Sequence, residues 1–230
     1  MSRIILIETS TALCSTALVE DGRIISYKES ETPRAQASLT APFVDEMLKE
    51  RGLKVKDCDA VCVSMGPGSY TGLRVGVSTA KGLCFGAGIP LLAVGTLDTL
   101  VWQAHDEGLL PEGCTAVVPM VDARRMEVYA AVFAPDGKQL TDTQPQIVDG
   151  SSFAEQLSAG PVLFIGDGAG KCKEVLNHPN AYFVQCCPKA SAMLHPAVKT
   201  FDNGEYKDTA YFEPFYLKQF VATVSNKKLW

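Results

Sequence analysis

The chain has 230 residues, of which 47% are apolar and 20% charged, and its formal net charge is −5. This balance is typical of a globular protein with one large domain or two small ones. No apolar run reaches the roughly 20 residues that cross a bilayer, and the net acidity argues against nucleic-acid binding through charge alone. The N-terminus lacks the features of a signal peptide and the eight cysteines form no CxxC pair, so we expect a reduced, cytoplasmic protein.

The first half predicts a three-strand meander followed by alternating helices and strands. Asp21-Gly22 is typical of a tight turn between two antiparallel strands. Apolar residues at i+4 spacing predict a helix from Gln36 that ends before Gly52, and Thr96 is expected to cap a later helix. The expected strands are residues 3–7, 14–19, 23–28, 60–65 and 91–94, and the expected helices are residues 36–51, 73–86 and the segment after Thr96.

The second half predicts the same order of elements. The expected strands are residues 116–121, 127–133, a short one ending near Val148, 162–165 and 182–185, and the expected helices begin near residues 151, 170 and 191. An order of β-β-β-α-β-α that occurs twice predicts a duplicated α/β fold, in which each mixed sheet is flanked by helices. We expect a first lobe of residues 1–103 and a smaller second lobe of residues 104–230, whose C-terminal tail returns to the first lobe.

Two polar segments follow predicted strands of the first half. The glycine-rich segment from Gly66 to Gly76 opens a helix, where free amides could meet an anion or a partner carboxylate. It matches neither a Walker loop nor a dinucleotide fingerprint, and a tight turn with a capping hydroxyl is the alternative. Glu8, Thr9 and Ser10 follow the first strand and could hold a phosphate or form a plain polar turn. The candidate phosphate-loop residues are Glu8, Thr9, Ser10, Gly66, Gly68, Ser69 and Thr71.

Small residues recur along the helix that follows the glycine-rich segment. Gly72, Gly76, Ala80 and Cys84 are spaced four apart and therefore share one face. Such a groove lets another helix approach closely, and packing on the chain's own sheet is the equally weighted alternative.

The sequence contains no motif that predicts a catalytic centre. There is no HxxxH or HExxH pair, no GxSxG around Ser69, and no Ser-His-Asp set with a plausible spacing. The histidines, His105, His178 and His195, are scattered. We therefore expect no catalytic residue, no metal site and no cofactor.

Four segments together resemble the TsaB family, formerly called YeaZ. They are Ile7-Glu8-Thr9-Ser10-Thr11, the segment from Gly66 to Gly76, Asp122-Ala123-Arg124-Arg125-Met126-Glu127-Val128-Tyr129, and the tail from Glu213 to Lys218. The resemblance implies an actin-like fold built from two ribonuclease H-like lobes. It also implies a role in forming threonylcarbamoyladenosine next to the anticodon of tRNAs. In that pathway TsaD is the transferase, TsaB is its essential non-catalytic partner, and the ATPase TsaE joins them.

The motifs that this chain lacks distinguish between these related proteins. TsaD holds a metal with an HxxxH pair that this chain lacks, so the resemblance implies the partner rather than the transferase. The family pattern usually has Asp where Glu8 stands and Arg where Lys218 stands, which implies a degenerate phosphate-loop motif and a weaker contact at the tail. A nucleotide-binding ATPase of the actin or sugar-kinase type is an alternative, and a peptidase is a remote one.

The family's interface uses the two long helices of the first lobe, for TsaD and also for a homodimer when TsaD is absent. The residues that the resemblance implies at this interface are Leu39, Phe43, Met47, Gly72, Gly76, Ala80 and Cys84. Contact with tRNA is then expected only through the complex, because no basic stripe is present.

Overall fold

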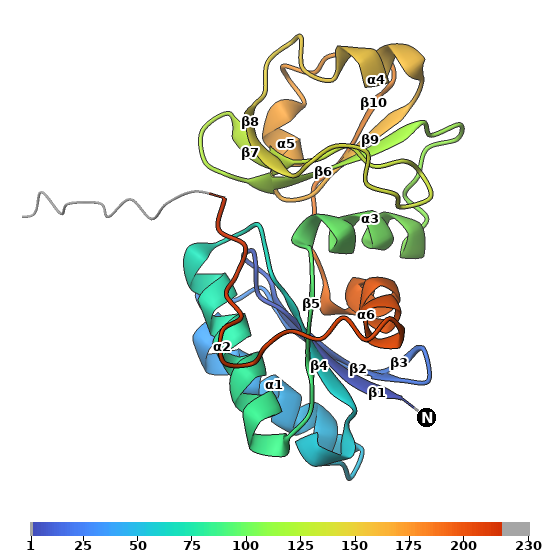
Figure 1. The fold of residues 1–230 in the computed structure, drawn as a ribbon. Helices are drawn as coiled ribbons and strands as arrows, with labels where there is room; N and C mark the ends of the chain where they lie inside the picture. The colour runs from blue at the N-terminus through green and yellow to red at the C-terminus, as the bar shows by residue number, and fades with distance from the viewer. Residues whose placement is uncertain (1, 218–230) are drawn as a thin grey trace, which may run out of the picture.

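Two five-stranded mixed sheets form the two lobes of the computed structural model, which describes residues 2–217 (Figure 1). The first sheet has the order β3(Arg23–Ser30)-β2(Cys14–Glu20)-β1(Arg3–Glu8)-β4(Ala60–Ser64)-β5(Leu91–Val94). The second has the order β10(Ala181–Val184)-β9(Val162–Ile165)-β6(Ala116–Asp122)-β7(Glu127–Ala130)-β8(Gln144–Ile147). In each sheet the first three strands of the chain are antiparallel and the next two are parallel. The predicted duplication is therefore confirmed by one shared strand order.

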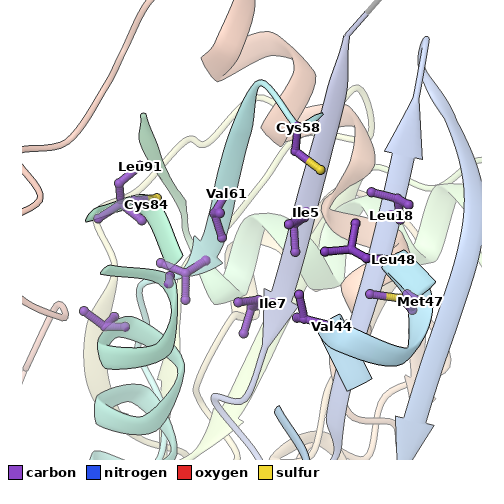
Figure 2. Close-up of a cluster of buried hydrophobic side chains, with 13 residues drawn as sticks. Ile5, Ile7, Leu18, Val44, Met47, Leu48, Cys58, Val61, Cys84 and Leu91 are labelled. Atoms are coloured by element: carbon purple, nitrogen blue, oxygen red, sulfur yellow. The ribbon is translucent and has the colours of Figure 1, made fainter. Parts of the chain in front are cut away.

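Two long helices cover one face of the first sheet. They are α1(Gln36–Glu50) and α2(Tyr70–Ala87), which lie next to each other on the sheet (Figure 1). Ile5 and Ile7 of β1 point toward this layer and meet Val44 of α1, and Cys84 of α2 belongs to the same cluster (Figure 2). Because strand residues alternate between faces, Ile4 and Leu6 project to the opposite side of the sheet.

Each lobe is completed by a helix from the other half of the chain. The 3-10 helix η2(Ala190–Met193) and α6(Leu194–Asp202) cover the second face of the first sheet, where Met193 is fully buried. In return α3(Thr96–Asp106) packs on the second sheet through Leu100 and its neighbours. The short helices α4(Ala154–Ala159) and α5(Ala169–Cys172) flank the other face of that sheet. The predicted boundary between residues 103 and 104 therefore falls inside α3.

Residues 207–217, which we call the strap, run back along the first lobe (Figure 1). Its backbone bonds to the first lobe at both ends, from Lys207 N to Leu91 O at 2.8 Å and from Phe215 N to Met65 O at 2.8 Å. Between them, Lys81 Nζ of α2 donates to the carbonyl oxygens of Ala210 and Phe212. The predicted contact of Lys218 lies outside the described residues.

Several element boundaries differ from those expected from the sequence. Gly95, not Thr96, precedes α3, and the Thr96 hydroxyl instead lies 2.8 Å from Ser64 Oγ. α2 begins at Tyr70 because Ser69 Oγ caps it by accepting from Gly72 N at 3.3 Å. Further differences lie elsewhere in the chain. β3 ends at Ser30, β7 ends at Ala130, α4 begins at Ala154 and α5 ends at Cys172. The additional 3-10 helix η1(Val55–Asp57) follows α1, and α6 continues from η2.

Candidate functional site

The two segments predicted to form a phosphate loop meet at the start of α2. Ser69 N donates to Ser10 O at 2.6 Å, and Thr9 Oγ1 donates to Gly72 O at 2.8 Å. A Cβ at Gly68 would lie 2.3 Å from Ser10 O, and a Cβ at Gly72 would lie 2.1 Å from Thr9 O. These glycines are therefore required for the close approach of the turn after β1, which we call the β1 turn (residues 9–12).

The β1 turn occupies the surface that a phosphate would need. The side chains of Glu8, Thr9 and Ser10 are fully buried, whereas Ser69 and Thr71 are exposed on the other side of the contact. The backbone amides of Ser69 and Gly72 already have acceptors within the chain. An anion that bound to these two amides would have to displace those acceptors. Gly66, the remaining predicted position, is buried in the turn that follows β4, with φ of +108°.

Glu8 is a buried acid with one unsatisfied oxygen. Its Oε1 accepts a hydrogen bond from Ser10 N at 2.6 Å, but its Oε2 has no partner. Burial raises the pKa of Glu8 to about 7, and the bonds from Ser10 oppose this shift. Ser10 Oγ and Thr11 Oγ1 are also buried without hydrogen-bond partners.

The small-residue stripe of α2 lies on the inner side of the helix. A Cβ at Gly76 would lie 2.3 Å from Thr9 Oγ1, and Ala80 and Cys84 are buried in the first-lobe core with Met47 of α1. The stripe therefore packs on the chain's own sheet, which was the alternative left open by the sequence. Gly72, Gly76, Ala80, Cys84 and Met47 are all buried within the folded chain, so a partner that approaches the chain meets other residues first.

The outward side of the two helices carries a different set of residues. Phe85 is 86% exposed, and a Cβ at Gly82 or Gly86 would meet nothing within 4 Å. Leu39 and Phe43 of α1 are half-buried. Phe85 was not predicted from the sequence, although it is an aromatic residue outside the inward i+4 positions of the helix.

The second lobe repeats the contact between a strand end and a glycine turn. Gly168 N donates to Met120 O at 2.9 Å, and Asp167 Oδ1 accepts from Asp122 N at 2.9 Å. Asp122 is exposed, however, and forms an ion pair with Lys171. Arg124 and Arg125 form the adjoining hairpin turn with φ of +73° and +52° and are also exposed.

Among residues 2–217, no three His, Cys, Asp or Glu side chains are grouped so that they could hold a metal ion. A membrane-spanning helix is also not found in this part of the chain.

Comparisons with known proteins agree with this architecture. The model of the TsaD family, described as tRNA N6-adenosine threonylcarbamoyltransferase, matches residues 30–220. The protein named tRNA threonylcarbamoyladenosine biosynthesis protein TsaB from Escherichia coli is 32% identical over 96% of both chains. The protein of the same name from Bacillus subtilis is 30% identical over 75% of this chain and 74% of its own.

Solved structures extend the comparison to three dimensions. YeaZ from Pseudomonas aeruginosa superposes with a TM-score of 0.80 at 29% identity, covering 94% of this chain and all of that one. The activator of 2-hydroxyisocaproyl-CoA dehydratase from Clostridium difficile, at 9% identity and a TM-score of 0.50 over 88% of this chain and 96% of its own, shares only the fold. The two-lobed, actin-like fold is thus confirmed. With the near-complete match to the Escherichia coli protein, these findings show that the chain belongs to the TsaB family, within the wider group described by the TsaD model.

Proposed function

We propose that this protein acts in the cytoplasm in the biosynthesis of tRNA threonylcarbamoyladenosine, as a non-catalytic partner of a TsaD-type transferase. The observation that carries the proposal is the match to the Escherichia coli TsaB protein along 96% of both chains. A TsaE-type ATPase joins the complex, and tRNA is reached through the complex rather than by this chain itself.

The closed phosphate loop supports a non-catalytic role. The β1 turn packs directly against the glycines of this loop, so the start of α2 is used for packing within the chain. Glu8 lies beneath this turn and has no access to solvent. A group that acts on a substrate must come within hydrogen-bond reach of it, and Glu8 meets that condition only if the turn moves.

The outward side of α1 and α2 is the surface we assign to the partner. Phe85 supplies an exposed aromatic anchor of the kind that dominates binding energy in protein interfaces. Gly82 leaves open space beside it on the same helix. The half-buried Leu39 and Phe43 add apolar residues near the start of α1, toward the other end of the two-helix layer from Phe85. Two copies of one such face can also form a two-fold homodimer, because a two-fold interface is self-complementary.

The experiment is size-exclusion chromatography with light scattering on the protein alone and mixed with the TsaD-type protein from the same source. We expect a homodimer that converts to a mixed complex. The variants Gly82→Trp and Phe85→Ser should both weaken the mixed complex at least tenfold, while leaving the circular dichroism unchanged and without lowering the Tm. Leu140→Ser is the matched control, because Leu140 is 54% exposed on the second lobe. Association of both variants at wild-type strength would reject the surface, and a chain that ignores the TsaD-type protein would reject the role.

A nucleotide-dependent enzyme is the second candidate, favoured by the buried carboxyl of Glu8, whose Oε2 has no hydrogen-bond partner. The pKa of Glu8 is raised to about 7, and such perturbed groups concentrate in active sites. Titration calorimetry of the isolated chain with ATP and Mg²⁺ distinguishes the two candidates. We expect no binding heat at millimolar ATP, and tight binding that is lost in Glu8→Gln would favour the enzyme.

A further inference from the structure

The buried polar cluster below the β1 turn has no role in the proposed partner function. It consists of Glu8, Ser10, Thr11 and the hydroxyl pair of Ser64 and Thr96, all of which are buried. Native proteins rarely leave buried polar atoms unpaired, and each exception asks for an explanation. Here three such atoms occur within four residues: Glu8 Oε2, Ser10 Oγ and Thr11 Oγ1.

The hydrogen-bonding capacity of these atoms indicates that a proton on Glu8 would satisfy them. An ionised Glu8 would offer only acceptors. Hydrogen bonds from Ser10 and Ser64 favour that form, but burial away from water outweighs them, and Oε2 itself has no hydrogen-bond partner. A protonated Glu8 gains one O–H donor on Oε2, and a hydroxyl such as that of Ser10 can accept from it. One proton thus satisfies a carboxyl oxygen and a hydroxyl together.

Within residues 2–217, no positively charged group is among those that shift the pKa of Glu8, so none replaces this proton. The titratable groups that face Glu8 are the thiols of Cys14 on β2 and Cys62 on β4. Burial raises the pKa of both thiols, and the nearby Glu8 adds to the shift, so both are neutral at physiological pH. The Ser64 hydroxyl opposes the rise in the pKa of Glu8, but it is neutral and also lies 2.8 Å from the Thr96 hydroxyl.

We propose that Glu8 is a proton-binding site that couples the β1 turn to the start of α2. When the proton is bound, the turn stays closed over the glycine-rich segment. When it leaves, the buried carboxylate is unpaired, and the turn opens to hydrate it. Opening breaks the bonds from Ser69 N to Ser10 O and from Thr9 Oγ1 to Gly72 O, so the first turn of α2 loosens. The structure thus contains a device that responds to pH at one end of a long surface helix.

The sign of the stability effect follows from linkage. The pKa of Glu8 is about 7 in the folded chain against a reference of 4.5. The folded state therefore binds the proton more tightly between these two values, and stability falls as the pH rises from about 4.5 to about 7. Above that window Glu8 is ionised in both states and contributes no further slope.

Carbon-13 NMR of the full chain, labelled at the glutamate side-chain carboxyls, tests the proton site directly. We expect one resonance that titrates with a midpoint between pH 6 and 8 and that is absent in Glu8→Gln. Amide hydrogen exchange at Ser69 and Gly72, corrected for intrinsic rates, should accelerate at least fivefold between pH 6 and pH 8 in the wild type. The same amides should show no such change in Glu8→Gln.

Glu20→Gln is the matched control, because Glu20 lies on β2 in an ion pair with Arg3 at 2.6 Å. In this variant the Glu20 carboxyl resonance is lost, but amide exchange at Ser69 should change with pH as it does in the wild type. Ser10→Ala provides a second variant if Glu8→Gln does not fold, and it should move the Glu8 midpoint by removing an acceptor. A Glu8 midpoint below pH 6 would overturn the proposal, as would equal pH dependence of exchange in the wild type and Glu8→Gln.

Discussion

The two lobes share one strand order but differ in how their helices cover the sheets. α1 and α2 have 15 and 18 residues, whereas their counterparts α4 and α5 have 6 and 4. Covering a five-stranded sheet of this kind therefore does not require long helices. The extra length of α1 and α2 leaves an outward side with Phe85 exposed, which is where we place the partner.

The equivalent strand ends differ in solvation as well. After β1, Glu8 is fully buried beneath its turn, and after β6, Asp122 is exposed and paired with Lys171. One topology thus holds a buried acid in one lobe and a solvent-exposed ion pair in the other. At equivalent strand ends, the first lobe therefore buries its carboxyl group, whereas the second lobe leaves its carboxyl group exposed to water.

The largest expected effect tests whether the lobes are independent. Leu100 and Met193 are fully buried, and each completes the sheet of the opposite half. Leu100→Ala and Met193→Ala should each lower the free energy of unfolding by about 3 kcal/mol, because each leaves a core cavity. Urea denaturation should show one cooperative transition in both variants. Two separate transitions, with only one shifted by each variant, would contradict the conclusion that the exchanged helices make the two lobes unfold together.

Alanine substitutions at the two glycine contacts, one in each lobe, should have a smaller effect on stability. Gly72→Ala should cost about 2–3 kcal/mol, because the new Cβ would lie 2.1 Å from Thr9 O. Gly168→Ala, whose Cβ would lie 2.9 Å from Val128 Cγ1, should cost about 1 kcal/mol. Thermal unfolding measures both.

Gly82→Ala is the control on the same helix as Gly72. Its Cβ would meet nothing within 4 Å, and alanine favours a helix, so stability should rise by about 0.5–1 kcal/mol. Equal effects of the Gly72 and Gly82 substitutions would show that α2 does not present the faces described here.

The smallest effect concerns the ion pair of the second lobe. Lys171→Met should lower stability by about 0.5–1 kcal/mol at low salt, because the pair with Asp122 is partly exposed. The difference should shrink in 1 M NaCl, where such pairs are screened. Lys49→Met, which breaks a more exposed pair with Asp45, serves as the control with a change near zero. A salt-independent loss at Lys171 would indicate that its bond to Glu127 O dominates.

The sequence predicted the strands well where apolar residues form compact runs. β4, β5 and β9 lie within one residue of their expected bounds, because such runs are bounded by turn residues. The short helices were placed less well. α4 begins late because Asp149 accepts bonds from Ser151 and holds a turn there, a contact that periodicity does not encode.

The sequence predicted which segments of the candidate site belong together, but not which way their residues face. The segment at Glu8 and the segment at Gly66 were expected to belong together, and they do meet. Four small residues at i+4 spacing fit a partner helix or a sheet equally well, so their burial could be learned only from the fold. The exchange of α3 and α6 was invisible for the same reason, since periodicity defines a buried face but not the sheet that it meets.

The exchange of helices has a consequence for the order of events during synthesis. The strands of the first sheet are complete once Val94 has been made, but Ile4 and Leu6 are covered only by residues from Ala190 onward. Roughly 100 residues must be translated in between, which takes about 5–20 s at the usual rate of elongation. During that interval the nascent sheet exposes an apolar face beside the ribosome. We expect this stage, rather than the finished protein, to be where the chain depends most on chaperones.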